Sequence, residues 1–248
     1  MKDFIYDNLY RQDQFHWWYR GKREIVLSLL DTLPPREPKG KIIDFGCGCG
    51  LMLKELDRYG EPTGADFSKQ ALDYCRKRFS GPLVQQDLSI PYAGEGKYAL
   101  GIALDILEHI PDDRTAAENL CRFLEPGGTC VITVPANQWM WSAHDENCMH
   151  VRRYSRQSLQ RLLTGAGFHI DYISYYNSLL FFPAALSRLA SRALHLDQDD
   201  TMESAFQDNW LNRLLYHVFR SEKYWIAKGR HFPFGVSLIA VVTKPLPA

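Results

Sequence analysis

A glycine-rich run that directly follows an apolar, strand-like segment is the feature that most constrains the fold of this chain. Residues 41–45 read Lys-Ile-Ile-Asp-Phe, and Gly-Cys-Gly-Cys-Gly follows at 46–50. Glycines at such a turn let the backbone bend tightly and approach a ligand closely. The run therefore predicts a strand, a ligand-binding loop and a helix within a parallel α/β sheet.

Short β-rich runs and helical patterns alternate from residue 41 to residue 134, as in a parallel sheet with crossover helices. The expected strands are 41–45, 62–66, 83–87, 98–104 and 129–134, and the expected helices are 51–59, 68–79 and 111–124. Later segments predict a helix at 155–165 and strands at 168–176 and 236–242. We interpret the chain as one domain, 1–248, made of an aromatic N-terminal segment 1–39, a core 40–176, a helical insert 177–232 and the last strand 233–248.

Composition narrows the class of protein further. The chain has 248 residues, 46% of them hydrophobic, and 29 basic residues balance 29 acidic ones. Such a chain can bury a core, and without a basic surplus we expect no nucleic-acid partner. Charges near the amino terminus and apolar stretches too short to cross a bilayer predict a cytoplasmic protein. The six cysteines lack a paired spacing, so neither a disulfide nor a metal is expected.

Acidic residues end the strands that follow the glycine run. Asp66 lies where a carboxylate can accept hydrogen bonds from ribose hydroxyls, and Asp87 can accept one from an adenine amino group. The dinucleotide motif would need glycine at position 51, where Leu51 stands. Together with Asp44, these carboxylates would repel a phosphate but tolerate a cation. The residues therefore predict S-adenosylmethionine, a nucleoside with a sulfonium charge and no phosphate.

Five motifs make the chain resemble the class I S-adenosylmethionine-dependent methyltransferases. In the family's order they are IIDFGCGCG at 42–50, GADFS at 64–68, QDL at 86–88, ALDILEHI at 103–110 and LEPGG at 124–128. The resemblance implies a Rossmann-like, mostly parallel α/β sheet of seven strands, with an antiparallel last strand inserted beside the fifth. It also implies S-adenosylmethionine as the cofactor.

The same resemblance implies which residues hold the cofactor. Around the methionine part would lie Gly46, Cys47, Gly48 and Gly50. Asp66 and Phe67 would contact the ribose, and Asp87 and Leu88 would border the adenine. Leu104 and His109, after the fourth strand, would lie beside the cofactor, although a structural role fits His109 equally well. The thiols of Cys47 and Cys49 are not expected to have a role of their own.

The segment 139–154 is dense in aromatic and ionisable residues and follows the fifth strand, where open α/β sheets bind ligands. His144 or His150 could remove a proton from an acceptor, and Arg152 or Arg153 could pair with an acidic substrate group. A zinc site made by His144, Cys148 and His150 is an alternative. A loop whose ion pairs only hold it to the domain is another.

Two further segments could cover the site. In the N-terminal segment the aromatic residues at 17–19 predict a helical lid and Arg20 could reach the methionine carboxylate, but an ordinary amphipathic helix fits equally well. In the insert, the apolar run 179–186 could roof a pocket, dimerise or rest on a membrane, with core packing favoured. Between Trp210 and Phe219 apolar residues recur at helical spacing as one stripe, and Asp200 with Glu203 suggests a capping box before it.

These features predict a methyltransferase that moves the sulfonium methyl group to a small-molecule or lipid-like acceptor by in-line displacement. A base is needed only if the acceptor is protonated at neutral pH. A cofactor-binding scaffold or partner subunit without transfer activity is the alternative, and an enzyme that uses another bond of the same cofactor, such as an aminopropyl transferase, is a third. The oligomeric state and the acceptor stay open.

Overall fold

The computed structural model of the protein describes residues 3–35, 39–94, 96–193 and 209–247. The strands are β1 (Lys41–Phe45), β2 (Glu61–Asp66), β3 (Leu83–Gln85), β4 (Tyr98–Leu104), β5 (Leu124–Pro135), β6 (His169–Tyr176) and β7 (Ser237–Thr243). The helices are α1 (Asp3–Gln12), α2 (Trp17–Leu30), α3 (Leu53–Leu56), α4 (Lys69–Arg76), η1 (Leu107–His109), α5 (Asp113–Phe123), η2 (Gln138–Met140), α6 (Ala143–Asn147), α7 (Arg156–Gly165), α8 (Phe181–Ala193), α10 (Trp210–Ser221) and α11 (Lys223–Ile226).

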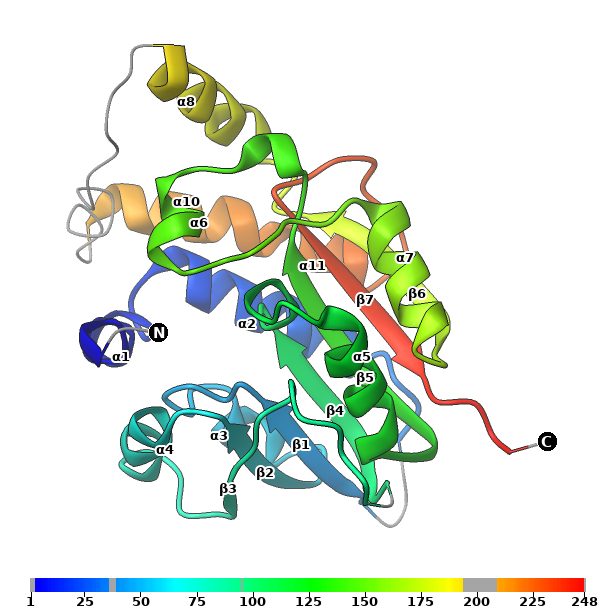
Figure 1. Ribbon diagram of the computed structural model, residues 1–248. Coiled ribbons are helices and arrows are strands. Elements are labelled where there is room, and N and C mark those ends of the chain that lie inside the picture. The colour runs from blue at the N-terminus through cyan, green and yellow to red at the C-terminus, as the bar shows by residue number, and fades with distance from the viewer. Residues whose placement is uncertain (1–2, 36–38, 95, 194–208, 248) are drawn as a thin grey trace.

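The strands form one seven-stranded sheet in the order β3-β2-β1-β4-β5-β7-β6 (Figure 1). β7 runs antiparallel to both of its neighbours, β5 and β6, while the pairs from β3 to β5 are parallel. β4 and β7 are buried along nearly their whole length, as expected for strands covered on both faces. The sheet order and the antiparallel last strand beside the fifth confirm the fold that the resemblance implies.

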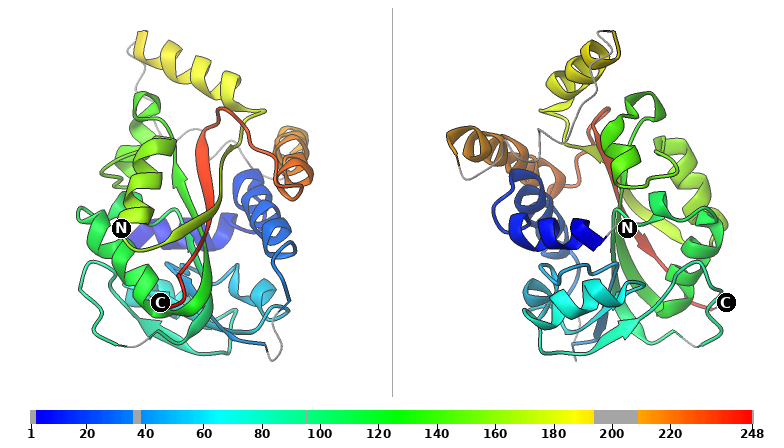
Figure 2. Two further views of the ribbon diagram at one scale, coloured as in Figure 1. Left: turned by 90° about the vertical axis from the view of Figure 1, so that its right-hand side faces the viewer. Right: turned by 60° about the vertical axis from the view of Figure 1, so that its left-hand side comes forward.

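Helices cover both faces of the sheet (Figure 2). On one face α5 and α7 pack through Leu120, Leu159 and Leu163 against β4, β5 and β7. On the other face α2, α3, α10 and α11 form a second core, in which Ile25 and Phe219 are fully buried. The glycine loop leaves β1 at the carboxyl edge of the sheet, and Cys47 of the loop packs into the second core.

Some predicted boundaries differ from the observed ones. The strand expected at 129–134 begins at Leu124, because Leu124 pairs with Tyr98 across an irregularity in the β4–β5 ladder. The third strand ends at Gln85 rather than at residue 87, and the helix expected at 51–59 keeps only Leu53–Leu56 in α-helical form. These short elements lie at the sheet edge and in the glycine turn, where few neighbours support regular structure.

The aromatic residues of the N-terminal segment do not form the predicted lid. Trp18 stacks on Phe219, with ring centroids 5.1 Å apart, and Trp17 meets the same ring edge-on. His16 caps α2, because its Nδ1 accepts from the backbone N–H of Trp18, and burial lowers the pKa of His16 to about 4 and so keeps it an acceptor. The aromatic half of this segment is therefore core, and only α1 lies over the glycine loop.

The helical insert exposes more apolar surface than expected. On α8, Phe182 and Leu186 are 65% and 70% exposed, so core packing is wrong for this part of the run, although Ala185 is buried. On α10 the predicted stripe is divided: Phe219 is buried and Trp210 is 75% exposed. The α10 helix is capped by Asn209, and the suggested capping box at Asp200 and Glu203 lies outside the described residues. No helix in the described ranges is long and apolar enough to cross a membrane.

Candidate active site

The glycine loop between β1 and α3 forms the cofactor side of the site. Gly46, Gly48 and Gly50 all have positive φ, at 61°, 51° and 79°. A Cβ atom on Gly50 would lie 2.5 Å from Sγ of Cys75, and one on Gly46 would lie 3.0 Å from the Ile106 side chain. Backbone conformation thus favours glycine at all three positions, and close packing also requires it at Gly46 and Gly50.

Asp66 fixes this loop from the end of β2. Its Oδ2 accepts the backbone N–H of Gly48 at 3.0 Å, and its Oδ1 accepts that of Ser68 at 2.9 Å. Burial raises the pKa of Asp66, and the same two N–H groups oppose that rise. Each carboxylate oxygen can accept a second hydrogen bond, so Asp66 still has acceptors for ribose hydroxyls. These acceptor positions of Asp66 therefore fit the ribose hydroxyls of S-adenosylmethionine.

The other predicted cofactor residues line the next strand ends. Oδ1 of Asp87 accepts from the backbone N–H and the hydroxyl of Ser89, which holds the carboxylate in a turn after β3. Leu88 packs into the main core, so only its backbone is left for the adenine. Phe67 is 55% exposed and Leu104 is half-buried at the end of β4. An exposed aromatic ring beside Asp66 is suited to cover a nucleoside.

The helix α1 closes the loop from outside (Figure 2). Tyr6 is buried against Cys49 and Ala71, and Leu9 lies 3.5 Å from the position of a Cβ on Gly48. Sγ of Cys49 contacts the Tyr6 carbonyl oxygen at 3.6 Å, and burial raises the pKa of this thiol to about 12. The thiol is therefore protonated at neutral pH and serves packing.

An ion pair between α2 and the end of β4 is a feature that sequence reasoning missed. Nζ of Lys22 donates to Oδ2 of Asp105 at 2.7 Å, and the Thr133 hydroxyl donates to Oδ1 at 2.9 Å. Burial would raise the pKa of Asp105, but Lys22, together with the Thr133 hydrogen bond and the charge of His150, outweighs burial and lowers that pKa. Asp105 also has a positive φ of 55°, a strained conformation that often marks functional positions. In the sequence, the acidic Asp105 directly after an apolar strand could have indicated that a buried cation pairs with it.

Arg153, Asp145 and His150 form a buried network after β5. Nε and Nη2 of Arg153 donate to the two carboxylate oxygens of Asp145 at 2.7 and 2.9 Å, and Nδ1 of His150 lies 2.8 Å from Oδ1. Burial alone would raise the pKa of Asp145, but the hydrogen bonds from His150 and Arg153 hold it below its usual range. With Nδ1 bound to Asp145, His150 is left with Nε2 for another partner.

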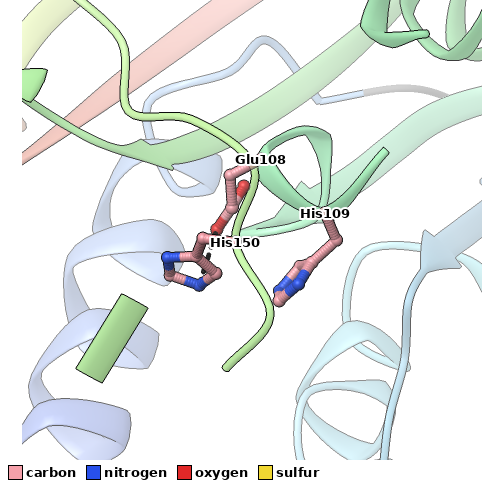
Figure 3. Close-up of side chains that lie close together, drawn as sticks. All are labelled: Glu108, His109 and His150. Carbon is pink, nitrogen blue, oxygen red and sulfur yellow. Dashed lines mark ion pairs between the residues drawn. The ribbon is translucent and has the colours of Figure 1, made fainter. Parts of the chain in front are cut away.

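That free nitrogen faces two residues of η1 (Figure 3). Nε2 of His150 lies 4.0 Å from Oε1 of Glu108, and the rings of His150 and His109 are 4.7 Å apart. Burial, followed by the charge of Asp105, raises the pKa of Glu108 well above its usual value. Burial also lowers the pKa of His109 to about 4, so its imidazole is neutral. The histidine predicted to lie beside the cofactor thus belongs to a side-chain cluster at the end of β4.

The remaining predicted residues fall into two groups. His144, on α6, has its Nε2 3.7 Å from Sγ of Cys148, and burial of its ring lowers the pKa of the imidazole to about 4. Both arginines expected to bind substrate are instead engaged within the protein, Arg153 with Asp145 and Arg152 with Asp113. Their assignment to an acidic substrate is therefore wrong, and the alternative of ion pairs that hold the segment is confirmed for them.

Arg20 lies away from the position expected for it. Its guanidinium stacks over the ring of Tyr216 on α10, 4.0 Å from the centroid. To reach the methionine carboxylate it would have to leave this ring.

A separate hollow, lined by Lys41, Glu61 and Lys97, lies at the amino-terminal edge of the sheet and has no contact with the glycine loop.

The fold and the glycine loop with its acidic partners define a class I S-adenosylmethionine-dependent methyltransferase. The chain belongs to the methyltransferase domain family, whose model matches residues 17–173. A ubiquinone biosynthesis O-methyltransferase from Alkalilimnicola ehrlichii is 30% identical over 104 residues, covering 38% of this chain and 40% of the relative. One from Thiobacillus denitrificans is 30% identical over 127 residues, covering 45% and 54%. The chain thus matches about half the length of these curated relatives.

Solved structures share the fold at low sequence identity. A chain of the complex between the Haloferax volcanii Trm112 methyltransferase activator and a methyltransferase matches with a TM-score of 0.61 at 19% identity, covering 98% of this chain and 97% of that one. Phosphoethanolamine N-methyltransferase 2 of Haemonchus contortus, bound to phosphomonomethylethanolamine and S-adenosylhomocysteine, matches with a TM-score of 0.55 at 19% identity, covering 88% and 52%. At this identity the two structures support the fold alone.

Proposed function

We propose that this methyltransferase methylates a hydroxyl group of a small-molecule or lipid-like acceptor. The observation that carries the proposal is the adjacency of two unlike regions: the glycine loop contacts Ile106, and the cluster of Glu108, His109 and His150 follows directly. One region suits a cationic nucleoside and the other suits a hydroxyl group that must lose a proton. The relatives named O-methyltransferases support the choice of oxygen.

The residues of the chain then have separate tasks. Asp66 and the glycine loop bind and orient the nucleoside, and α1 excludes water from that loop. When bound, S-adenosylmethionine supplies a methyl group that is already activated by the sulfonium charge. Nε2 of His150, fixed through Asp145, faces the oxygen of the acceptor. His144, whose ring lies 6.2 Å from that of His150 and whose pKa is lowered to about 4 by burial, is a neutral imidazole and accepts the proton.

Exposed apolar side chains on α8 favour an acceptor that has an apolar part. Phe182 on α8 packs edge-on against Phe181, which in turn contacts Trp139 of the segment before α6. These rings connect the exposed face of α8 with the polypeptide that carries His144 and His150. An acceptor with an apolar tail could therefore lie along α8 while its hydroxyl group reaches the histidines.

The proposal is tested by incubating the purified chain with methyl-labelled S-adenosylmethionine and separated lipid and water-soluble extracts. We expect label in an O-methylated product, found by mass spectrometry, and none with Asp66→Ala. His144→Asn should lower kcat roughly 100-fold or more without changing the affinity for S-adenosylhomocysteine. Cofactor binding without any labelled product would instead support a scaffold, and a product that gains an aminopropyl group would identify a different transferase.

A further inference from the structure

The cluster of Glu108, His109 and His150 has the composition of a metal site. Each residue offers one ligand atom, and these atoms all lie within 4.8 Å of one another (Figure 3). Two imidazoles and one carboxylate form a set that binds zinc and other divalent first-row metals in proteins, with positions left for water or substrate. The sequence did not indicate this set, because its residues come from η1 and from the segment after α6, about forty positions apart. The zinc alternative raised from the sequence, His144 with Cys148 and His150, shares only His150 with the cluster found among the described residues.

Glu108 supplies an independent observation. Its side chain is 0% exposed, and neither carboxylate oxygen has a hydrogen-bond partner among the described residues. A buried carboxylate that accepts no hydrogen bond is costly, and its one ionic neighbour, Nε2 of His150, lies 4.0 Å away. Native proteins normally hydrogen-bond such a group or use it to coordinate a metal. The carboxylate faces the two imidazoles, so its oxygens, which accept no hydrogen bond, lie at the centre of the cluster.

Asp145 prepares His150 for such a role. It binds Nδ1 at 2.8 Å and is itself held on both oxygens by Arg153. A carboxylate that fixes one imidazole nitrogen and directs the other toward an ion is the usual outer partner of a metal-bound histidine. Arg153 and Asp145 are both buried, so this arrangement is rigid before any ion arrives.

We propose that Glu108, His109 and His150 bind one divalent transition-metal ion of the kind that zinc represents. Ligand atoms around such an ion are roughly 3.4 Å apart, because metal–ligand bonds are about 2.1 Å long. Closing the cluster thus requires side-chain movements of about 1 Å, within the reach of small χ rotations. An ion there would hold and polarise the acceptor's hydroxyl oxygen, while the hydroxyl proton passes to His144. This catalytic part rests on the proposed function, but ion binding does not.

The test measures metal binding on the full chain without an added tag or acceptor. After treatment with a chelator, Zn²⁺ is titrated by calorimetry, and Co²⁺ is titrated by visible absorption, which reports on coordination. We expect one bound ion with Kd below about 1 μM, and Mg²⁺ in excess should not displace it because it prefers oxygen ligands. Glu108→Gln and His150→Asn should each weaken binding at least 10-fold, and so should Asp145→Asn through its hold on His150.

A control variant and a third ligand variant separate a built site from adventitious binding. His169→Asn changes an exposed histidine at the start of β6 and should leave the affinity unchanged. His109→Asn should weaken metal binding like the other ligand substitutions, with an unchanged far-UV circular dichroism spectrum and unfolding temperature as signs of correct folding. The proposal is overturned if no ion binds below about 100 μM, or if the three ligand variants bind as the parent does. Since no acceptor is present, failure of methyl transfer would leave this result intact.

Discussion

The cofactor side of the site and the acceptor side that we propose are built in different ways. The cofactor side consists of consecutive residues at strand ends, such as Gly46–Gly50 after β1 and Asp66–Ser68 after β2. The acceptor side joins side chains from α2, η1, α6 and the segment before α7 through contacts such as Lys22 to Asp105. A binding loop can therefore be local in sequence, whereas the acceptor region depends on long-range contacts and can differ between relatives that share the loop.

The largest expected effect comes from the buried network of the acceptor side. Asp145→Ala would leave the Arg153 guanidinium buried without its carboxylate, and we expect a loss of about 3–5 kcal/mol in the free energy of unfolding. Arg114→Ala, which breaks an ion pair with a 76% exposed arginine, should cost less than about 1 kcal/mol. Urea denaturation of both variants checks this, and similar losses for the two would mean that the network does not hold the acceptor side.

A glycine substitution tests the cofactor side, again through the free energy of unfolding. Gly50→Ala places a Cβ 2.5 Å from Sγ of Cys75 at a backbone φ of 79°, so a loss of about 2–4 kcal/mol is expected. Gly165→Ala is the matched control, because nothing lies within 4 Å of its Cβ position in α7, and it should be neutral or slightly stabilising. Thermal unfolding distinguishes them. A Gly50→Ala protein as stable as the parent would show that the loop is less tightly packed than described.

The dependence of stability on pH probes the contact that holds α8. Oε1 of Glu222 accepts the backbone N–H groups of Ser178 and Leu179 at 2.7 and 2.8 Å, and burial raises the pKa of Glu222 to about 7. Because the folded state holds this proton more tightly than the unfolded chain, its contribution to stability is fully present below about pH 4.5 and is lost as pH rises through about 7. The full difference is roughly 3 kcal/mol.

Glu222→Gln keeps the acceptor oxygen and removes the titration. The difference in unfolding free energy between the parent and this variant should therefore change between pH 4.5 and 7.5, in the direction of a relatively more stable variant at high pH. Glu55→Gln, at a position with a 44% exposed side chain, provides the control. A parallel pH profile for the parent and Glu222→Gln would contradict the assigned pKa.

The same contrast explains how much the sequence could predict. The glycine loop and the place of Asp66 at a strand end followed from motifs whose residues act through nearby backbone, whereas the arrangement of the sheet followed from the family that these motifs resemble. Trp18 and Arg20 contact partners far along the chain, Phe219 and Tyr216, and Arg153 pairs with Asp145 through the short helix α6, which the sequence did not predict. The charge and size of these side chains are compatible with several partners, and the partner is determined by how the folded chain packs.

Calorimetric titration with S-adenosylhomocysteine tests the central claim most directly, because it asks whether the glycine loop and Asp66 form the cofactor site. Asp66→Ala removes a carboxylate from the end of β2, and Asp73→Ala removes an exposed one from α4. We predict that the parent and Asp73→Ala bind with equal affinity, and that Asp66→Ala binds roughly 100-fold more weakly while still folding. Unchanged affinity in Asp66→Ala would contradict the claim.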